Sequence, residues 1–294
     1  MPGCISPQQH FMFIYKQYNE EQLNNQYNIR LHVPDFATYF ERWEKLSSET
    51  RKTHPIIKDI FYGDNERECL DVFPSAKPNS KTLVFVHGGY WHLFDKTKFH
   101  FIAEAFYADN VTTVLLNYPL APAATIDEMV TSCRRAVLWL HENIRRFNGD
   151  PQQLYIIGNS AGAHLAAMIM EKKWMDKNAA GFIKGVCLLS GIFNLLPVQL
   201  LQLNSVLNIS SETAACNSPA ALTPAEDCKL LICVGADETD EFKSQSRQLY
   251  ENWKDKNTAI QFLELPGINH YSMLEPLLDK TSVLHKAMHK MMNI

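Results

Sequence analysis

The chain has 294 residues, of which 46% are hydrophobic and 20% charged, and its formal net charge is −4. This composition is typical of a globular protein with a large core, and the slightly acidic balance excludes the basic surface that binding to nucleic acid or to an anionic membrane needs. The seven cysteines are odd in number, scattered and without a C-x-x-C pair, which favours reduced thiols over a disulfide framework or a zinc site.

The N-terminal segment, MPGCISPQQHFMFIYK, has an apolar run of only five residues and no early positive charge, which is not the pattern of a signal peptide. No apolar stretch approaches the ~18 residues that a membrane-spanning helix needs. We therefore expect a cytoplasmic protein with neither a membrane nor a nucleic acid as its partner. No repeat and no linker rich in Pro, Gly or Ser divides the chain, which predicts one domain over residues 1–294.

The predicted elements begin with a helical extension over residues 1–55. Within it, residues 35–52 have the pattern of an amphipathic helix that starts at a candidate N-cap, Asp35. Eight short apolar runs follow, and most are rich in Val, Ile, Leu or Phe, as strands buried on both faces are. These predicted strands are Ile56–Tyr62, Cys69–Phe73, Thr82–Val86, Val111–Leu116, Leu154–Ile157, Val186–Leu189, Leu230–Val234 and Ile260–Leu265.

Helical patterns separate the later strands. Residues 125–147 repeat apolar side chains at three- and four-residue spacing, with Thr125 and Glu128 forming a capping box, and another helix begins at Asp240. This alternation predicts a mostly parallel sheet of about eight strands with helices on both faces, and the first two or three strands, which are closely spaced, predict an antiparallel meander. The apolar but irregular residues 191–226 predict a small cap inserted over the carboxyl edge of the sheet.

The sequence Gly158-Asn-Ser160-Ala-Gly162 is a G-x-S-x-G motif between an apolar strand and an alanine-rich helix. In that context the motif is typical of the nucleophile elbow of the α/β-hydrolase fold, a sharp turn that lifts the serine into the open. A Cβ at either glycine would meet the neighbouring strand or helix. The same letters could form a Gly/Ser-rich turn with no chemistry, but the strand before and the helix after favour a nucleophile.

A serine nucleophile needs a base, and the base needs an orienting acid. In the α/β-hydrolase fold the three follow along the chain in the order serine, acid, histidine. The loop after the seventh predicted strand offers Asp237, Glu238 and Asp240, and His270 follows the last strand. The order therefore indicates His270 as the base, while the residues alone leave the acid open.

The stretch VFVHGGYWH, residues 84–92, is an apolar run that ends in two glycines, so its backbone can approach another group closely. In this fold the loop after the third strand supplies oxyanion-hole amides beside the N–H of the residue that follows the serine. We therefore expect the loop that holds Gly88, Gly89 and Tyr90 to form the oxyanion hole together with the N–H of Ala161.

These motifs occur together with others: HGGYW, GNSAGAHL, SGIFNL, SPAAL, VGADETDEFKSQS, GINHYSML and, near the N-terminus, YNIRLHVPDFATYFERW. In this combination, and over most of its length, the chain resembles the kynurenine formamidases (arylformamidases) of the α/β-hydrolase superfamily. The H-G-G-x-W motif is the more specific mark, because related lipases and esterases usually carry H-G-G-G. The resemblance implies hydrolysis of N-formyl-L-kynurenine to L-kynurenine and formate, in tryptophan degradation, without a metal or another cofactor.

The resemblance assigns the nucleophile to Ser160 and the base to His270. In the family the acid lies four residues before a phenylalanine of the next helix, here Phe242, which selects Glu238 over Asp237. Most animal relatives have aspartate at that position, so glutamate is a departure, although the fold accepts either acid.

The expected partner is a small aromatic formamide, whose ring must be held on the leaving-group side of the site. Tyr90, Trp91 and Phe94 are candidates for the wall against that ring, and a packed hydrophobic loop is an equally good interpretation of them. His87 is expected either to hold the loop through a hydrogen bond or to be a buried structural residue, and His164 to be a packing residue. A homodimer is possible.

Two other functions stay open at this point. A general carboxylesterase would use the same triad on small acyl esters, and a hydrolase-fold protein without activity would serve in binding. The chain has no G-x-G-x-x-G or P-loop. Its histidines are expected to show no H-E-x-x-H or comparable ligand spacing, so we expect no metal.

Overall fold

The structure, a computed structural model, describes residues 12–257 and 259–294. Cys4 and residues 1–11 of the N-terminal segment lie outside the described residues. A central sheet has eight strands in the order β1-β2-β4-β3-β5-β6-β7-β8. The strands are β1 (Ile57–Phe61), β2 (Cys69–Phe73), β3 (Ser80–Val86), β4 (Thr112–Leu116), β5 (Gly149–Asn159), β6 (Ile183–Leu189), β7 (Lys229–Gly235) and β8 (Ile260–Leu265).

The mostly parallel sheet of eight strands is confirmed. All neighbouring pairs from β4 to β8 along the sheet are parallel, and only β1–β2 and β2–β4 are antiparallel. The predicted meander is therefore limited to β1 and β2, and its extension to a third strand is wrong. β3 lies between β4 and β5 and is parallel to both. The long segment that joins β3 to β4 returns the chain to the same end of the sheet, as a parallel pair requires.

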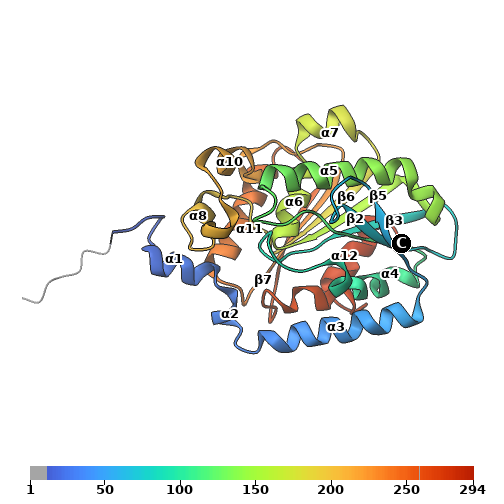
Figure 1. Cartoon of the computed structure of the whole chain (residues 1–294), viewed down its shortest axis with the longest axis horizontal. Coiled ribbons are helices and arrows are strands. Elements are labelled where there is room, and N and C mark those ends of the chain that lie inside the picture. The colour runs from blue at the N-terminus through green and yellow to red at the C-terminus, as the bar shows by residue number, and fades with distance from the viewer. Residues whose placement is uncertain (1–11, 258) are drawn as a thin grey trace, which may run out of the picture.

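Helices cover both faces of the sheet, as predicted. In Figure 1, α5 and α6 lie on one side of the strands and α3, α4 and α12 on the other. The α-helices are α1 (Glu20–Tyr27), α2 (Ile29–His32), α3 (Phe36–Thr53), α4 (Glu104–Tyr107), α5 (Ile126–Asn143), α6 (Ala161–Ile169), α7 (Lys172–Asn178), α8 (Leu196–Gln199), α9 (Asn204–Leu207), α10 (Ser211–Cys216), α11 (Asp240–Trp253) and α12 (Val283–Met292). Four segments are 3₁₀-helical: η1 (Lys96–Ala103), η2 (Ile144–Phe147), η3 (Pro219–Ala221) and η4 (Ser272–Leu277). Within the described ranges, none of these helices combines the length and the apolar composition of a membrane span.

The two predicted helix starts differ in their outcome. At α5, the capping box is confirmed, since Thr125 Oγ1 accepts from the N–H of Glu128 and Glu128 Oε2 accepts from the N–H of Thr125. At α3, Asp35 occupies the N-cap position, but its side chain caps no backbone N–H. Its φ of −90° and ψ of 19° are not extended, whereas a capping side chain needs an extended backbone to reach the first turn.

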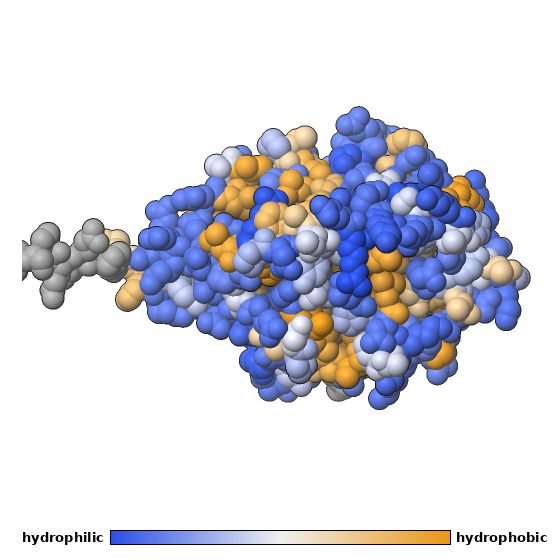
Figure 2. Space-filling model, turned by 90° about the horizontal axis from the view of Figure 1, so that it is seen from below, coloured by the Kyte–Doolittle hydropathy of each residue, from blue (hydrophilic) through white to orange (hydrophobic). Residues whose placement is uncertain are grey.

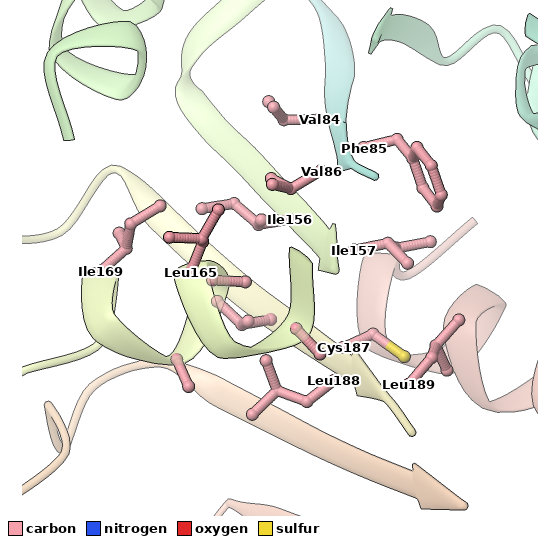
Figure 3. Packing of buried hydrophobic residues seen from close by; sticks show 14 of the residues in the cluster. Val84, Phe85, Val86, Ile156, Ile157, Leu165, Ile169, Cys187, Leu188 and Leu189 are labelled. Carbon is pink, nitrogen blue, oxygen red and sulfur yellow. The ribbon is translucent and has the colours of Figure 1, made fainter. Parts of the chain in front are cut away.

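The sheet core is apolar on both sides, which is why its strands read as nearly continuous hydrophobic runs. In Figure 3, Val86 of β3 and Ile156 of β5 point toward Leu165 of α6, while Phe85 and Ile157 point away from it. All five side chains are buried. The packing fixes α6 against the middle of the sheet. The turn between β5 and α6 follows the end of β5, so it lies at the carboxyl edge of the sheet.

Residues 191–226 lie between β6 and β7 and hold three short helices, α8 to α10, and η3.

Seen from below in Figure 2, the surface is mostly hydrophilic, with apolar side chains gathered in separate patches. Large exposed apolar residues on the N-terminal segment and in 191–226 include Met12, Leu31, Leu196 and Leu200. The six cysteines of the described part are free thiols.

Candidate active site

Ser160 stands at the turn between β5 and α6. Its φ of 56° and ψ of −119° are a conformation that L-residues rarely adopt, and such strain persists only where the surroundings impose it. The Ser160 N–H donates to Leu189 O over 2.8 Å, and α6 starts at the next residue. The strained turn that the G-x-S-x-G motif predicts is therefore present.

The two glycines of the motif have no room for a side chain, as predicted. A Cβ on Gly158 would come within 2.3 Å of Gly162 O in α6. A Cβ on Gly162 would come within 2.0 Å of Val86 O and 2.5 Å of His87 O, at the end of β3. Small residues at these positions are what allow strand, turn and helix to approach so closely.

His270 and Glu238 form a buried pair. His270 Nδ1 lies 2.6 Å from Glu238 Oε2, and the two residues are 8% and 7% exposed. The other carboxylate oxygen, Oε1, accepts from Ser190 Oγ at 2.5 Å and from the Gly235 N–H at 2.8 Å. With Nδ1–H donating to the carboxylate, the lone pair of the imidazole is on Nε2, where a general base needs it.

The other two acids of the loop lie apart from the histidine. Asp237 is exposed, and its N–H donates to Ile268 O. Asp240 is the first residue of α11 and pairs with Lys243 at 3.3 Å. Of the three acids in this loop, the structure thus brings only Glu238 to His270. The residues alone could not decide between Asp237 and Glu238, because the decision depends on the direction in which the folded turn after β7 points each side chain.

Ser160 and His270 line one cavity. Within the described residues they are not hydrogen-bonded to each other, and such pairs are often loose until a substrate is bound.

The HGGYW loop lies against the nucleophile. A Cβ on Gly88 would be 3.0 Å from Ser160 Cβ, so the backbone passes directly over the serine. Gly89 has a φ of 109° and Tyr90 a φ of 48°, and a positive φ is uncommon for a residue with a side chain. No hydrogen bond within the described residues takes the N–H of Gly89, Tyr90 or Ala161. Within the described residues, these three N–H groups are therefore unpaired.

His87 sits beneath this loop and is fully buried. Its Nδ1 bonds Gly88 O over 2.7 Å, and its ring stacks on Tyr118 with ring centroids 4.6 Å apart. Burial lowers the pKa of His87 to about 4, so the ring is neutral near pH 7. This arrangement fits both roles expected for it, since His87 makes a hydrogen bond to the loop and is also a buried, packed residue.

Trp91 differs from its two neighbours in the predicted ring wall. Tyr90 and Phe94 line the cavity, whereas Trp91 is fully buried and lies outside the lining. Its indole Nε1–H donates to His164 Nδ1 over 3.2 Å, and His164 Nε2–H donates to Asn217 O over 2.8 Å. The interpretation of Trp91 as a ring-wall residue is therefore corrected, because its indole packs under the loop instead of facing a ligand.

The cavity has a volume of about 970 Å³ and includes residues that the sequence did not suggest. Part of its lining comes from the cap, at residues 201–203, and more from α1, α2 and α3 of the N-terminal extension. Tyr90 Oη donates to Tyr27 O at the end of α1, and the Gln202 N–H donates to Asn24 Oδ1 over 2.9 Å. No local pattern in the sequence indicates that the helical extension folds over the distant site. Its only signal was the stretch YNIRLHVPDFATYFERW, which is part of the family resemblance.

Comparisons with known proteins agree with this geometry. The family model BD-FAE matches residues 70–253. A protein named kynurenine formamidase from Danio rerio is 30% identical over 270 residues, which cover 90% of this chain and 88% of that protein. Another of that name, from Salmo salar, is 28% identical over 292 residues, which cover 95% and 98%.

Solved structures show the same fold. A protein from Silicibacter sp. TM1040, provisionally described as a thioesterase, has a TM-score of 0.80 and 25% identity, covering 90% of this chain and 97% of its own. An esterase from Pyrobaculum calidifontis has a TM-score of 0.67 at 16% identity, covering 88% and 92%. The expected fold class is thereby confirmed, and the chain is a hydrolase that belongs to the kynurenine formamidase family of the α/β-hydrolase superfamily.

Proposed function

We propose that this protein hydrolyses N-formyl-L-kynurenine to L-kynurenine and formate with Ser160 as nucleophile, His270 as base and Glu238 as orienting acid. The choice of substrate is supported by the relatives named kynurenine formamidase, which match 90% and 95% of this chain. The observation that carries the proposal is the buried His270–Glu238 pair, because its histidine lines the same cavity as a strained serine and several aromatic side chains.

The first half of the reaction forms an ester. Ser160 Oγ attacks the formyl carbon while His270 Nε2 takes the hydroxyl proton. The carbonyl oxygen becomes an oxyanion, which accepts hydrogen bonds from the N–H groups of Gly89, Tyr90 and Ala161. Each such donor contributes about 3 kcal/mol to the transition state. When the tetrahedral intermediate collapses, the C–N bond breaks, His270 gives its proton to the departing arylamine, and a formyl-serine ester remains.

The second half returns the enzyme to its resting state. A water molecule attacks the formyl ester as His270 Nε2 takes one of its protons, and the same amides hold the second oxyanion. The bond between Ser160 Oγ and the formyl carbon then breaks, His270 returns the proton to the serine oxygen, and the product leaves as formic acid, which ionises to formate in solvent. Because the acyl group is a single carbon, the room that the reaction needs lies on the leaving-group side.

The lining supports this requirement. The backbone of Gly88 lies close to Ser160, since a Cβ on Gly88 would be 3.0 Å from Ser160 Cβ. Phe40, Phe94 and Tyr271 line the same cavity, and the rings of Phe40 and Tyr271 lie 5.4 Å apart edge to face. An aromatic wall of this kind suits the ring of an aryl formamide.

A substrate comparison tests the proposal. We expect kcat/KM for N-formyl-L-kynurenine above about 10⁴ M⁻¹s⁻¹, within the usual range of enzymes, and at least tenfold above that for 4-nitrophenyl acetate. The measurement is steady-state turnover of both substrates by the same preparation. Turnover of the formamide near background, together with rapid cleavage of the ester, would leave a carboxylesterase with the same machinery and reject the proposed substrate.

Arg30 is the residue we assign to the carboxylate of the substrate. It is exposed on α2 and lines the cavity. Its guanidinium lies 5.0 Å over the ring of Phe36 and forms no ion pair with a described acidic residue. The Phe36 ring lies 6.2 Å from the ring of Tyr271, which lines the cavity, so the cation is near the aromatic wall. A cation beside an apolar wall fits an aromatic amino acid.

We expect Arg30→Gln to lower kcat/KM for N-formyl-L-kynurenine by about tenfold to a hundredfold, mainly through KM, because a hydrogen bond to a charged group contributes about 1.5–3 kcal/mol. Turnover of 4-nitrophenyl acetate, which has no carboxylate, should change less than about twofold. Arg42→Gln is the matched control, since Arg42 pairs with Glu275 at 2.7 Å and lies outside the lining. An equal loss on both substrates would show a general disturbance and reject carboxylate recognition.

A further inference from the structure

Three side chains that can bind a metal meet on the side of the molecule away from Ser160. His285 and His289 are one helical turn apart on α12, so they share a face of that helix. Asp109 lies between α4 and β4, a few residues before β4 starts. It is therefore at the amino edge of the parallel strands, opposite the edge where β5 ends at the nucleophile.

The potential ligand atoms of these residues converge. His285 Nε2 or Nδ1, His289 Nε2 or Nδ1 and a carboxylate oxygen of Asp109 lie within 4.8 Å of one another. His289 Nε2 and Asp109 Oδ2 are 3.2 Å apart. In a tetrahedral zinc site with bonds of about 2 Å, ligand atoms are about 3.3–3.5 Å apart. Only small side-chain movements separate the observed positions from that arrangement.

Three of these buried atoms have no hydrogen-bond partner among the described residues: His285 Nε2, His289 Nε2 and Asp109 Oδ2. His289 and Asp109 are close enough for an ion pair, but they are not aligned for a hydrogen bond. His285 itself is 2% exposed. Buried polar atoms are rarely left without a partner, so a group of three unpaired atoms facing one point needs an explanation.

The surroundings orient His285 as they orient metal-binding histidines. Its Nδ1 lies 2.6 Å from Leu277 O, so Nδ1 carries the proton and Nε2 presents a lone pair. A ring N–H bonded to a backbone carbonyl is the usual outer contact of a histidine ligand. Phe106 stacks on the His285 ring, with centroids 5.0 Å apart and planes 21° apart, and limits its rotation.

We propose that His285, His289 and Asp109 bind one divalent transition metal ion, of which Zn²⁺ is the best match to two imidazoles and a carboxylate. A water molecule would complete the four ligands that zinc prefers. The side chains of His289 and Asp109 are 26% and 24% exposed, which gives the ion a route from solvent. Bound there, the ion joins α12 to the segment before β4, a structural role separate from catalysis.

The expectation that the histidines show no ligand spacing is corrected by this motif. His285-Lys-Ala-Met-His289 has the i, i+4 spacing of H-E-x-x-H without its glutamate. The third ligand is distant in sequence, so the spacing of residues along the chain could not reveal it.

Binding of Zn²⁺ to the full chain tests the proposal. After dialysis against EDTA and then against metal-free buffer, calorimetric titration with ZnCl₂ should show one equivalent per chain with a Kd in the micromolar range or tighter. Co²⁺ in place of Zn²⁺ should give visible absorption bands of a four- or five-coordinate ion. The thermal midpoint should rise with Zn²⁺, whereas kcat/KM should change less than twofold between metal-free and Zn²⁺-loaded protein.

Variants at the two partly exposed ligands, His289 and Asp109, test where the ion binds and leave the buried ligand, His285, unchanged. His289→Gln and Asp109→Asn should each weaken Zn²⁺ binding by at least tenfold and abolish the Co²⁺ bands. His141→Gln is the matched control, because the His141 ring also bonds a backbone carbonyl, Pro151 O, but belongs to no such cluster. Far-UV circular dichroism and ester turnover verify that each variant is folded. No saturable binding by the unmodified chain, or binding that both variants retain, would overturn the proposal.

Discussion

Replacing Ser160 with alanine should lower kcat for N-formyl-L-kynurenine by about 10⁴-fold or more, since removing a serine nucleophile has costs of that order and leaves only binding and oxyanion stabilisation. The fold should survive, because the Ser160 hydroxyl caps no helix and alanine occupies less space at the same φ of 56°. Single-turnover and steady-state rates measure the loss, and thermal unfolding verifies the fold.

A buried serine away from the cavity provides the control. Ser246 lies on α11, is fully buried and has a hydroxyl without a partner among the described residues. Ser246→Ala should leave kcat/KM within about twofold of its original value. A serine-directed phosphonate should label the unmodified chain and the Ser246 variant but not Ser160→Ala. If Ser160→Ala keeps more than a tenth of the activity, no covalent formyl-serine route operates.

Glu238→Gln should lower kcat by about 10³–10⁴-fold, the effect of replacing a triad acid by its amide. The amide can offer His270 Nδ1 its N–H group, which favours the wrong tautomer of the imidazole, and it has no charge to stabilise the imidazolium. The loss should fall on kcat and kcat/KM alike, because the interaction matters only in the transition state. Asp237→Asn should change either value less than twofold, since this side chain is exposed.

The Glu238→Gln and Asp237→Asn variants serve as controls for each other. A third variant tests whether the length of the acidic side chain matters. Glu238→Asp keeps the charge but shortens the side chain, so it should recover part of the activity that Glu238→Gln loses. Because Ser190 and Gly235 also hold this carboxylate, a shorter side chain cannot satisfy all three contacts at once. A larger loss for Asp237→Asn than for Glu238→Gln would reverse the assignment of the acid.

Much of the site follows from sequence because it depends on local geometry. The G-x-S-x-G turn needs a strand before it and a helix after it, and both are visible in the apolar pattern around Ser160. The order serine, acid, histidine follows from the order of the strands. The inner strands are also predictable, because strands buried on both faces are nearly all apolar, whereas the edge strands β1 and β8 contain exposed and charged residues.

Other features depend on contacts that no local pattern encodes. Adjacent residues in a loop, Asp237 and Glu238, point in different directions, and only the folded turn after β7 decides which one meets His270. Likewise, Tyr90 and Trp91 are adjacent in the HGGYW loop but do not both line the cavity, because the Trp91 indole N–H donates to the buried His164. The place of β3 inside the parallel sheet depends on a long crossover and not on strand spacing.

The hydrogen bond from Tyr90 Oη to Tyr27 O joins the loop over the nucleophile to a helix more than sixty residues earlier in the chain. The segment matched by the family model begins at residue 70, so Ser160 lies inside that segment, whereas the part of the cavity lining that comes from α1, α2 and α3 lies before it. Substitutions between α1 and α3 can therefore alter which molecules are accepted while the nucleophile stays untouched. We therefore expect the shape of the cavity to depend on residues 20–53 as well as on the segment that holds Ser160.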